Sequence, residues 1–357
     1  MRIFAIGEPD YKTSNWYREI IEGLMSEKRR RRFSLMTLSA TDELQTRAVG
    51  RDDVAFLIGT NSAWLAGTVA LCESLFDNRV VVLGNYNLPH DGKRFSVVTS
   101  DIARDVRLLV DYLRACQKSR IALYGVNPES ASDAFKKESF LACGMCTADL
   151  YYNEGSLADC FASFSAKAKA YDGVICVNDY AALSLMHHLE GEPRPFVVSC
   201  GGSMLADRAS PTVTHTTVEY HAFAGVGIEL ARMLCDNPGI NSIRVLLSGG
   251  FTAGESTEHM PLPVSSGEAA RSVSKKEDKF YSDLEIDEMM KVEQLLSRCN
   301  DEDLLILERL LSGATYGDIA KELYMSENGI KYKLKNMFRL CGVPTRADFI
   351  RTFGKYL

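Results

Sequence analysis

Residues 313–340 read GATYGDIAKELYMSENGIKYKLKNMFRL, and this pattern predicts two short helices joined by a tight turn. Thr315 and Ser326 each stand just before one of these helices, where a side-chain oxygen can cap the N-terminus. Ile319, Leu323, Ile330 and Leu334 give the two helices apolar faces to bury, and the small Ala320 lets them approach closely at their crossing. The stretch is therefore predicted to form a helix-turn-helix.

Further helices are predicted on both sides of this motif. Asn300 can cap a preceding helix that stops at Gly313, and a fourth helix is expected from about residue 346. Together these helices define a small all-α domain over residues 299–357. Asp283 can cap one more helix ahead of it, over 283–298, which serves either as a connection or for dimerisation.

The outward face of the second motif helix is basic although the chain as a whole is acidic. Between 327 and 340 the cations are Lys331, Lys333, Lys335 and Arg339, against the single acid Glu327. The whole chain has a formal net charge of −6. Proteins that coat nucleic acid through bulk charge are basic overall, so any contact with DNA must be local to this helix.

The motif resembles the LuxR-type helix-turn-helix, without a gap over residues 299–352. The matching positions are Gly313, Ile319-Ala320, Leu323, Ser326, Ile330-Lys331, Asn336, Gly342-Val343 and Arg346. The resemblance implies binding of double-stranded DNA with the second motif helix in the major groove. The predicted DNA-contacting residues are Thr315, Ser326, Lys331, Tyr332, Lys333, Lys335, Asn336 and Arg346, and which lysine would read a base is left open. Gly329, Lys333 and residues 300–303 depart from the family's usual wording, so its contacts need not all be kept.

Residues 1–257 alternate short apolar runs with helical stretches, which predicts parallel sheets wrapped by helices in two lobes. The predicted strands are 2–6, 33–38, 53–58, 79–83, 95–99, 120–124, 172–177, 196–200 and 243–248. The predicted helices include 15–29, 62–76, 101–116, 156–170, 179–189 and 219–235. Residues 258–282 are rich in Ser, Gly, Pro and charge, and they are predicted to be an exposed linker.

This α/β region resembles the periplasmic-binding-protein-like sensors of LacI-type regulators. The resemblance rests on residues 96–101, 119–124, 171–182, 211–214 and 255–257. It implies a ligand cleft in which Lys136 takes the place of a usual Arg, Gly201 takes that of a pocket Asp, and Asn178 keeps a pocket-edge position. Without that Asp, the cleft lacks a carboxylate that could accept hydrogen bonds from two sugar hydroxyls. A sugar or sugar derivative is therefore one candidate among small polar ligands.

Loop residues after the early strands are predicted to face the same cleft. They are Asp10, Tyr11, Trp16 and Asn61, each of which can equally be an ordinary surface-loop residue. Asn178 has a second interpretation as the cap of the helix that starts at Asp179.

The remaining sequence features narrow the class of protein. Hydrophobic residues make up 46% of the chain, no secretory signal precedes the first predicted strand, and no apolar run is long enough to cross a membrane, so a cytoplasmic location is expected. The ten cysteines lie mostly in apolar runs, and the role of Cys143 and Cys146 is left open because no further ligand completes a metal site. No phosphate-binding glycine loop, nucleophile elbow or metal-ligand cluster points to an enzyme, and no cofactor is expected.

The sequence thus predicts a DNA-binding transcription regulator whose α/β domain responds to a small polar molecule. A homodimer is expected, because paired recognition helices read two half-sites, and RNA polymerase is a further candidate partner. The alternative is that the α/β domain binds a protein and no small ligand.

Overall fold

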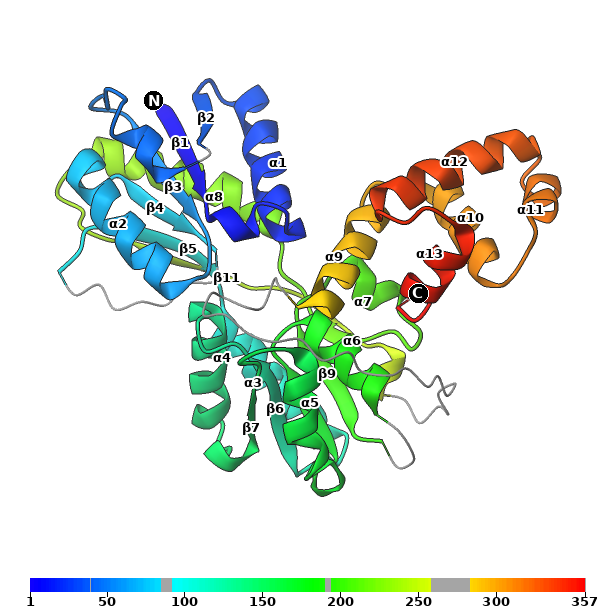
Figure 1. Ribbon diagram of the computed structural model, residues 1–357. Helices are drawn as coiled ribbons and strands as arrows, with labels where there is room; N and C mark the ends of the chain where they lie inside the picture. Colours follow the sequence, from blue (N-terminus) through cyan, green and yellow to red (C-terminus); the bar gives the residue numbers. More distant parts are fainter. Residues whose placement is uncertain (39, 85–91, 190–193, 258–282, 357) are drawn as a thin grey trace. The chain divides into compact units, whose positions relative to one another are not determined.

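The computed structural model of the chain describes residues 1–38, 40–84, 92–189, 194–257 and 283–356 (Figure 1). Contacts divide the chain into two compact units. Unit 1 comprises residues 1–117, 126–152 and 216–251, and unit 2 comprises 118–125, 153–215 and 252–357. The predicted linker, 258–282, lies outside the described residues.

A six-stranded sheet forms the centre of unit 1. Its strands lie in the order β11 (Arg244–Leu247), β5 (Ser96–Ser100), β4 (Val80–Leu83), β3 (Val54–Ile58), β1 (Arg2–Gly7) and β2 (Ser34–Leu38). Each neighbouring pair is parallel, which requires a crossover between successive strands. The predicted strands and the parallel arrangement are confirmed here.

Helices cover both faces of this sheet. One face packs Ile3 and Phe56 against α1 (Asn15–Arg30) and α8 (Tyr220–Asp236). The other face packs Phe4 and Leu57 against α2 (Ser62–Phe76). Because successive strand residues point to opposite faces, burial of both faces explains why β3 is the unbroken apolar run VAFLI.

A second six-stranded sheet has the order β12 (Phe251–Thr252), β10 (Thr214–Thr216), β9 (Phe196–Cys200), β8 (Gly173–Cys176), β6 (Ile121–Val126) and β7 (Leu150–Tyr152). β8 pairs in parallel with both β6 and β9. The helices of this part of the sequence are α3 (Ile102–Ala115), α4 (Ala131–Ala142), α5 (Leu157–Ser165), α6 (Asp179–His188) and α7 (Met204–Arg208). Short 3-10 helices lie at Pro9–Tyr11, Thr41–Leu44, Thr147–Asp149, Ala168–Ala170 and Glu255–Thr257. The two-lobed parallel α/β prediction is confirmed, whereas α4, α7 and the strands β7, β10 and β12 were not predicted.

Five helices make up the C-terminal part of unit 2. They are α9 (Leu284–Leu296), α10 (Asp301–Leu311), α11 (Tyr316–Glu322), α12 (Glu327–Leu340) and α13 (Arg346–Phe353). Gly313 and Gly342 follow α10 and α12 with φ of 91° and 70°, a left-handed conformation that favours glycine at a helix end. Among the described residues, no helix is both long and apolar enough to cross a membrane.

Candidate functional site

Side-chain caps fix where each C-terminal helix begins. The Asn300, Thr315 and Ser326 side chains accept hydrogen bonds from the backbone N–H groups three residues on, at 2.9, 3.2 and 3.0 Å. In return, the carboxylates of Asp303 and Asp318 accept from the backbone N–H of the residues that cap their helices. These caps confirm the predicted helix starts: α10 and α11 each begin with a reciprocal capping box, and α12 begins at the single Ser326 cap after the turn.

A small apolar core holds α11 against α12. Ile319, Ala320, Ile330 and Leu334 are all buried, as the helix-turn-helix pattern predicts. The turn between the helices passes through Tyr324, whose φ of 54° is uncommon for a bulky residue. The apolar side of α12 is buried in this core, and the opposite side of the helix faces solvent.

The outward face of α12 is polar and mostly cationic. Lys331, Lys335 and Arg339 are exposed, and Tyr332 retains 69% of its accessible surface. Lys331 Nζ lies 2.6 Å from a carboxylate oxygen of Glu327, but both side chains are half-exposed and such surface pairs are weak. The exposed cations remain able to meet a polyanion.

Lys333 is partly buried and is paired with carboxylates of the neighbouring helix α10. Its Nζ lies 2.7 Å from oxygens of both Glu302 and Asp303 on α10, and the hydrogen bonds to Asp303 and Glu302 raise its pKa. The side chains of Lys333 and Asp303 are 26% and 17% exposed. This predicted DNA contact therefore joins α10 to α12.

Other predicted DNA-contacting residues also serve the fold. The Arg346 guanidinium donates to the carbonyl of Ala314 at 3.0 Å and lies 5.5 Å from the centre of the Tyr316 ring, which ties α13 to the chain before α11. The hydroxyls of Thr315 and Ser326 are engaged as helix caps, and Asn336 is half-buried. Lys331, Tyr332 and Lys335 are thus the predicted contacts that lie most openly on the outer face.

The ligand candidates of the early loops lie in unit 1. The rings of Tyr11 and Trp16 meet edge to face with centroids 5.7 Å apart, although Tyr11 is buried and Trp16 only partly so. Asn61 caps α2 by accepting from the backbone N–H of Trp64 at 2.9 Å. The Asp10 side chain lies outside what the structure describes.

Lys136 is a buried member of an ion pair on α4. Its side chain is only 9% exposed, and its Nζ lies 2.9 Å from Oδ1 of Asp133, whose other oxygen accepts from the backbone N–H of Asn127. The ammonium therefore balances a buried carboxylate. Contact between Lys136 and a ligand stays a prediction.

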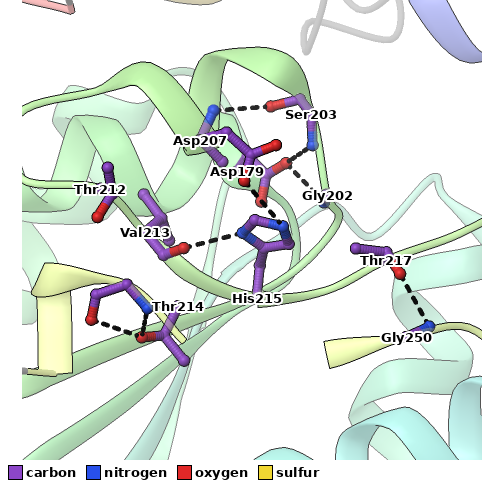
Figure 2. A network of polar contacts seen from close by, with 12 residues as sticks. Asp179, Gly202, Ser203, Asp207, Thr212, Val213, Thr214, His215, Thr217 and Gly250 are labelled. Carbon is purple, nitrogen blue, oxygen red and sulfur yellow. Dashed lines mark hydrogen bonds and ion pairs between the residues drawn. The ribbon is translucent and has the colours of Figure 1, made fainter. Parts of the chain in front are cut away.

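Asn178 and Gly201 lie in unit 2, next to the carboxylate of Asp179, which the sequence analysis did not identify as a site residue. Asn178 accepts from the backbone N–H of Ala181 at 2.9 Å, which confirms the helix-cap interpretation. Asp179 is 4% exposed, and one of its oxygens accepts from the backbone N–H groups of Gly202 and Ser203 at 2.9 and 2.7 Å (Figure 2). A β-carbon on Gly201 would lie 2.5 Å from both Asp179 oxygens, so the glycine makes room for this carboxylate.

We call residues 201–203, whose backbone Asp179 holds, the Asp179 loop. His215 on β10 completes the polar network around it (Figure 2). It is 1% exposed, its Nδ1 lies 2.8 Å from the carbonyl of Val213, and its Nε2 lies 3.6 Å from a carboxylate oxygen of Asp207 on α7. Neither Asp179 nor His215 was predicted as a site residue. The pair Asn178-Asp179 at a helix start was the available signal for the first, while nothing local marked the second.

The cysteines are all free. Cys143 is partly buried and Cys146 is exposed. Within the described ranges, no group of three or more His, Cys, Asp or Glu side chains is placed to hold a metal ion.

The chain matches no protein-family model, and no curated protein is similar to it at a significant level. Solved structures do share its fold. The transcriptional regulator CelR in complex with cellobiose is 18% identical, with a TM-score of 0.57 over 71% of this chain and 84% of that one. The lac repressor dimer bound to operator and the anti-inducer ONPF is 11% identical, with a TM-score of 0.58 over 71% of this chain and 93% of that one.

A LacI family transcriptional regulator from Enterococcus faecium with bound ribose is similar to the same degree. It is 17% identical, with a TM-score of 0.56 over 72% of this chain and the whole of that one. The two parallel-sheet α/β lobes of this chain therefore have the fold of LacI-family sensor domains.

Proposed function

We propose that this protein is a transcription regulator that binds double-stranded DNA through α12. The observation that carries the proposal is the α11–α12 pair, capped at both starts, whose outward face exposes Lys331, Tyr332, Lys335 and Arg339. An α-helix fits the major groove, and cations on its flanks neutralise phosphates. A basic helix on an acidic chain also favours contact through that helix alone.

A binding-site selection from a random duplex library, using the full chain, tests this function. We expect enrichment of one sequence motif, because direct readout of base edges discriminates between bases. If the protein is a dimer, as we propose, the motif will contain two half-sites about 10 base pairs apart. Lys331→Ala/Lys335→Ala is the control that should lose the enrichment, and an unenriched library with the wild type would refute DNA reading.

The α/β lobes are proposed to sense a small polar molecule. The support is the shared fold with LacI-family proteins, three of which were solved with cellobiose, ribose or glucose. A thermal-shift screen of mono- and disaccharides tests this, since a ligand bound only by the folded state raises Tm. At 100 times its Kd, a ligand stabilises the fold by about 2.7 kcal/mol.

Binding of a protein partner is the second candidate role for the lobes. The observation in its favour is that three predicted ligand contacts already have partners within the chain: Asn61 and Asn178 cap helices, and Lys136 pairs with Asp133. Under this alternative the saccharide screen gives no shift, whereas affinity purification yields a partner that is retained by Lys331→Ala/Lys335→Ala. Both roles leave α12 as the DNA-binding element.

A further inference from the structure

Helix α9 lies between the sensor fold and the DNA-binding helices of unit 2. It packs against α6 and α7 as well as against α12 and α13. Seven of its residues are buried: Ile286, Met289, Met290, Val292, Glu293, Leu295 and Leu296. A helix that packs on both groups cannot shift without affecting each of them.

Carboxylates of α9 and its cap make polar contacts with the helices of the lobe. Asp283 accepts from the backbone N–H of Leu157, the first residue of α5, at 2.7 Å. The Ser184 hydroxyl on α6 donates to Glu285 at 2.8 Å, and the Tyr180 hydroxyl, also on α6, donates to Glu293. We call these three contacts the α9 seam.

The carboxylates of the seam are at least partly sheltered from water: Asp283 and Glu285 are partly buried and Glu293 is buried. Glu293 is 4% exposed, and Oε1 of Glu285 is buried without a hydrogen-bond partner. Burial raises the pKa of both Asp283 and Glu285. Buried carboxylates depend strongly on each remaining donor, so the seam holds α9 in one position on α6.

The same helix α6 begins at the candidate ligand residues. Asn178 caps it, and its first residue, Asp179, holds the backbone of Gly202 and Ser203. Ser203 in turn caps α7 by accepting from the backbone N–H of Ala206 at 3.2 Å. The N-terminal ends of both helices that support α9 therefore meet at Asp179 (Figure 2).

We infer that α6 and the α9 seam couple the Asp179 loop to the DNA-binding helices, so that a displacement at the loop changes how firmly α9 and α12 are held. This coupling rests on the proposed function for its biological meaning. Tyr180 and Ser184 act in it as positioning residues, because they touch α9 and lie outside the DNA-binding helices.

The first test removes the seam from the lobe side in the full chain. Tyr180→Phe/Ser184→Ala deletes two donors to carboxylates, and we expect amide hydrogen exchange in residues 284–296 to become at least about tenfold faster. Tyr152→Phe/Ser165→Ala is the matched control: Tyr152 is on β7, and Ser165 is an exposed residue whose hydroxyl donates within α5. Exchange equal to wild type in the seam variant would overturn the inference.

The second test asks whether a change at the loop travels through the seam. Gly201→Ala places a β-carbon against the Asp179 carboxylate, and it should accelerate exchange in residues 284–296 of the otherwise wild-type chain. In the Tyr180→Phe/Ser184→Ala background it should add little, because the connection is already broken. Equal acceleration in both backgrounds, or none in either, would contradict coupling through the seam.

Binding of a fluorescein-labelled duplex by the same variants separates the two proposals. We expect Tyr180→Phe/Ser184→Ala to weaken binding about fivefold or more, because α12 loses the support of α9. If the wild-type chain binds no DNA, the proposed function fails, while the exchange measurements still decide whether the loop is coupled to α9. If exchange responds as expected but DNA affinity is unchanged, α9 does not transmit to α12 and the coupling is refuted.

Discussion

Removing Lys331 and Lys335 tests the proposed DNA interface on α12 quantitatively. Each exposed ammonium that neutralises a phosphate contributes about 0.9 to the slope of log K against log salt. Lys331→Ala/Lys335→Ala should therefore reduce the magnitude of that slope by about 1.8 and weaken binding about 60-fold near 0.1 M salt. Both side chains are exposed, so folding should be little affected.

The assay is fluorescence anisotropy of a labelled duplex, titrated with the full chain at several salt concentrations. Lys333→Ala is the first control: its ammonium is already held by Glu302 and Asp303, so the slope should change by less than about 0.4. Lys167→Ala/Lys169→Ala is the second control, because it removes the same charge from an exposed site in the lobe. A Lys331→Ala/Lys335→Ala protein with wild-type slope and affinity would refute binding of DNA by α12.

Three further predictions concern stability. Leu334→Ala opens a cavity between α11 and α12 and should destabilise the helix-turn-helix by about 2–5 kcal/mol. Urea unfolding followed by circular dichroism measures this loss. Unchanged stability would show that this core does not hold α11 against α12. Ser326→Ala removes the α12 cap at a cost of about 1 kcal/mol, and Ser326→Asn should recover most of the loss in the same measurement. Burial of Asp105 on α3 raises its pKa from 3.8 to about 6, so the folded state favours the protonated acid and the free energy of unfolding should fall as pH rises from about 4 to 6. Asp105→Asn should flatten this part of a plot of Tm against pH. A plot as steep as that of the wild type would exclude Asp105 as the source of the pH dependence.

Local signals were enough to locate most elements. The caps Asn300, Thr315 and Ser326 each satisfy their own helix start within three residues, so their roles can be read from neighbours in the sequence. The buried strands appear as apolar runs for a similarly local reason, because both faces of a parallel sheet are covered. The helix-turn-helix and the alternating α/β pattern were predicted on that basis.

Helix α4 was not predicted because four of its six buried residues are polar, the other two being Ala131 and Phe140. Ser132, Asp133, Lys136 and Ser139 are all buried, so residues 131–142 show no apolar stripe at helical spacing. The ion pair between Asp133 and Lys136 compensates both buried charges. A search for hydrophobic periodicity does not detect such a contact.

Site residues whose partners lie far away in the sequence were the hardest to assign. Lys333 is paired with Asp303, 30 residues earlier, and Asp179 holds Ser203, 24 residues later. In both cases the basic or acidic character was visible in the sequence, but the partner was not. The ion pairs of Lys333 were therefore not predicted, and its contact with DNA stays a prediction.

The Asp283 carboxylate serves two helices at once, because Oδ1 accepts from Glu285 of its own helix and Oδ2 accepts from Leu157 at the start of α5. One carboxylate thus caps α9 and also accepts a hydrogen bond from the start of α5, so replacing Asp283 would remove both contacts. A chimera made by moving residues 283–357 onto another α/β domain would need a host helix whose first N–H faces Asp283. This requirement limits the α/β domains with which helices α9 to α13 can recombine, in the laboratory or in evolution.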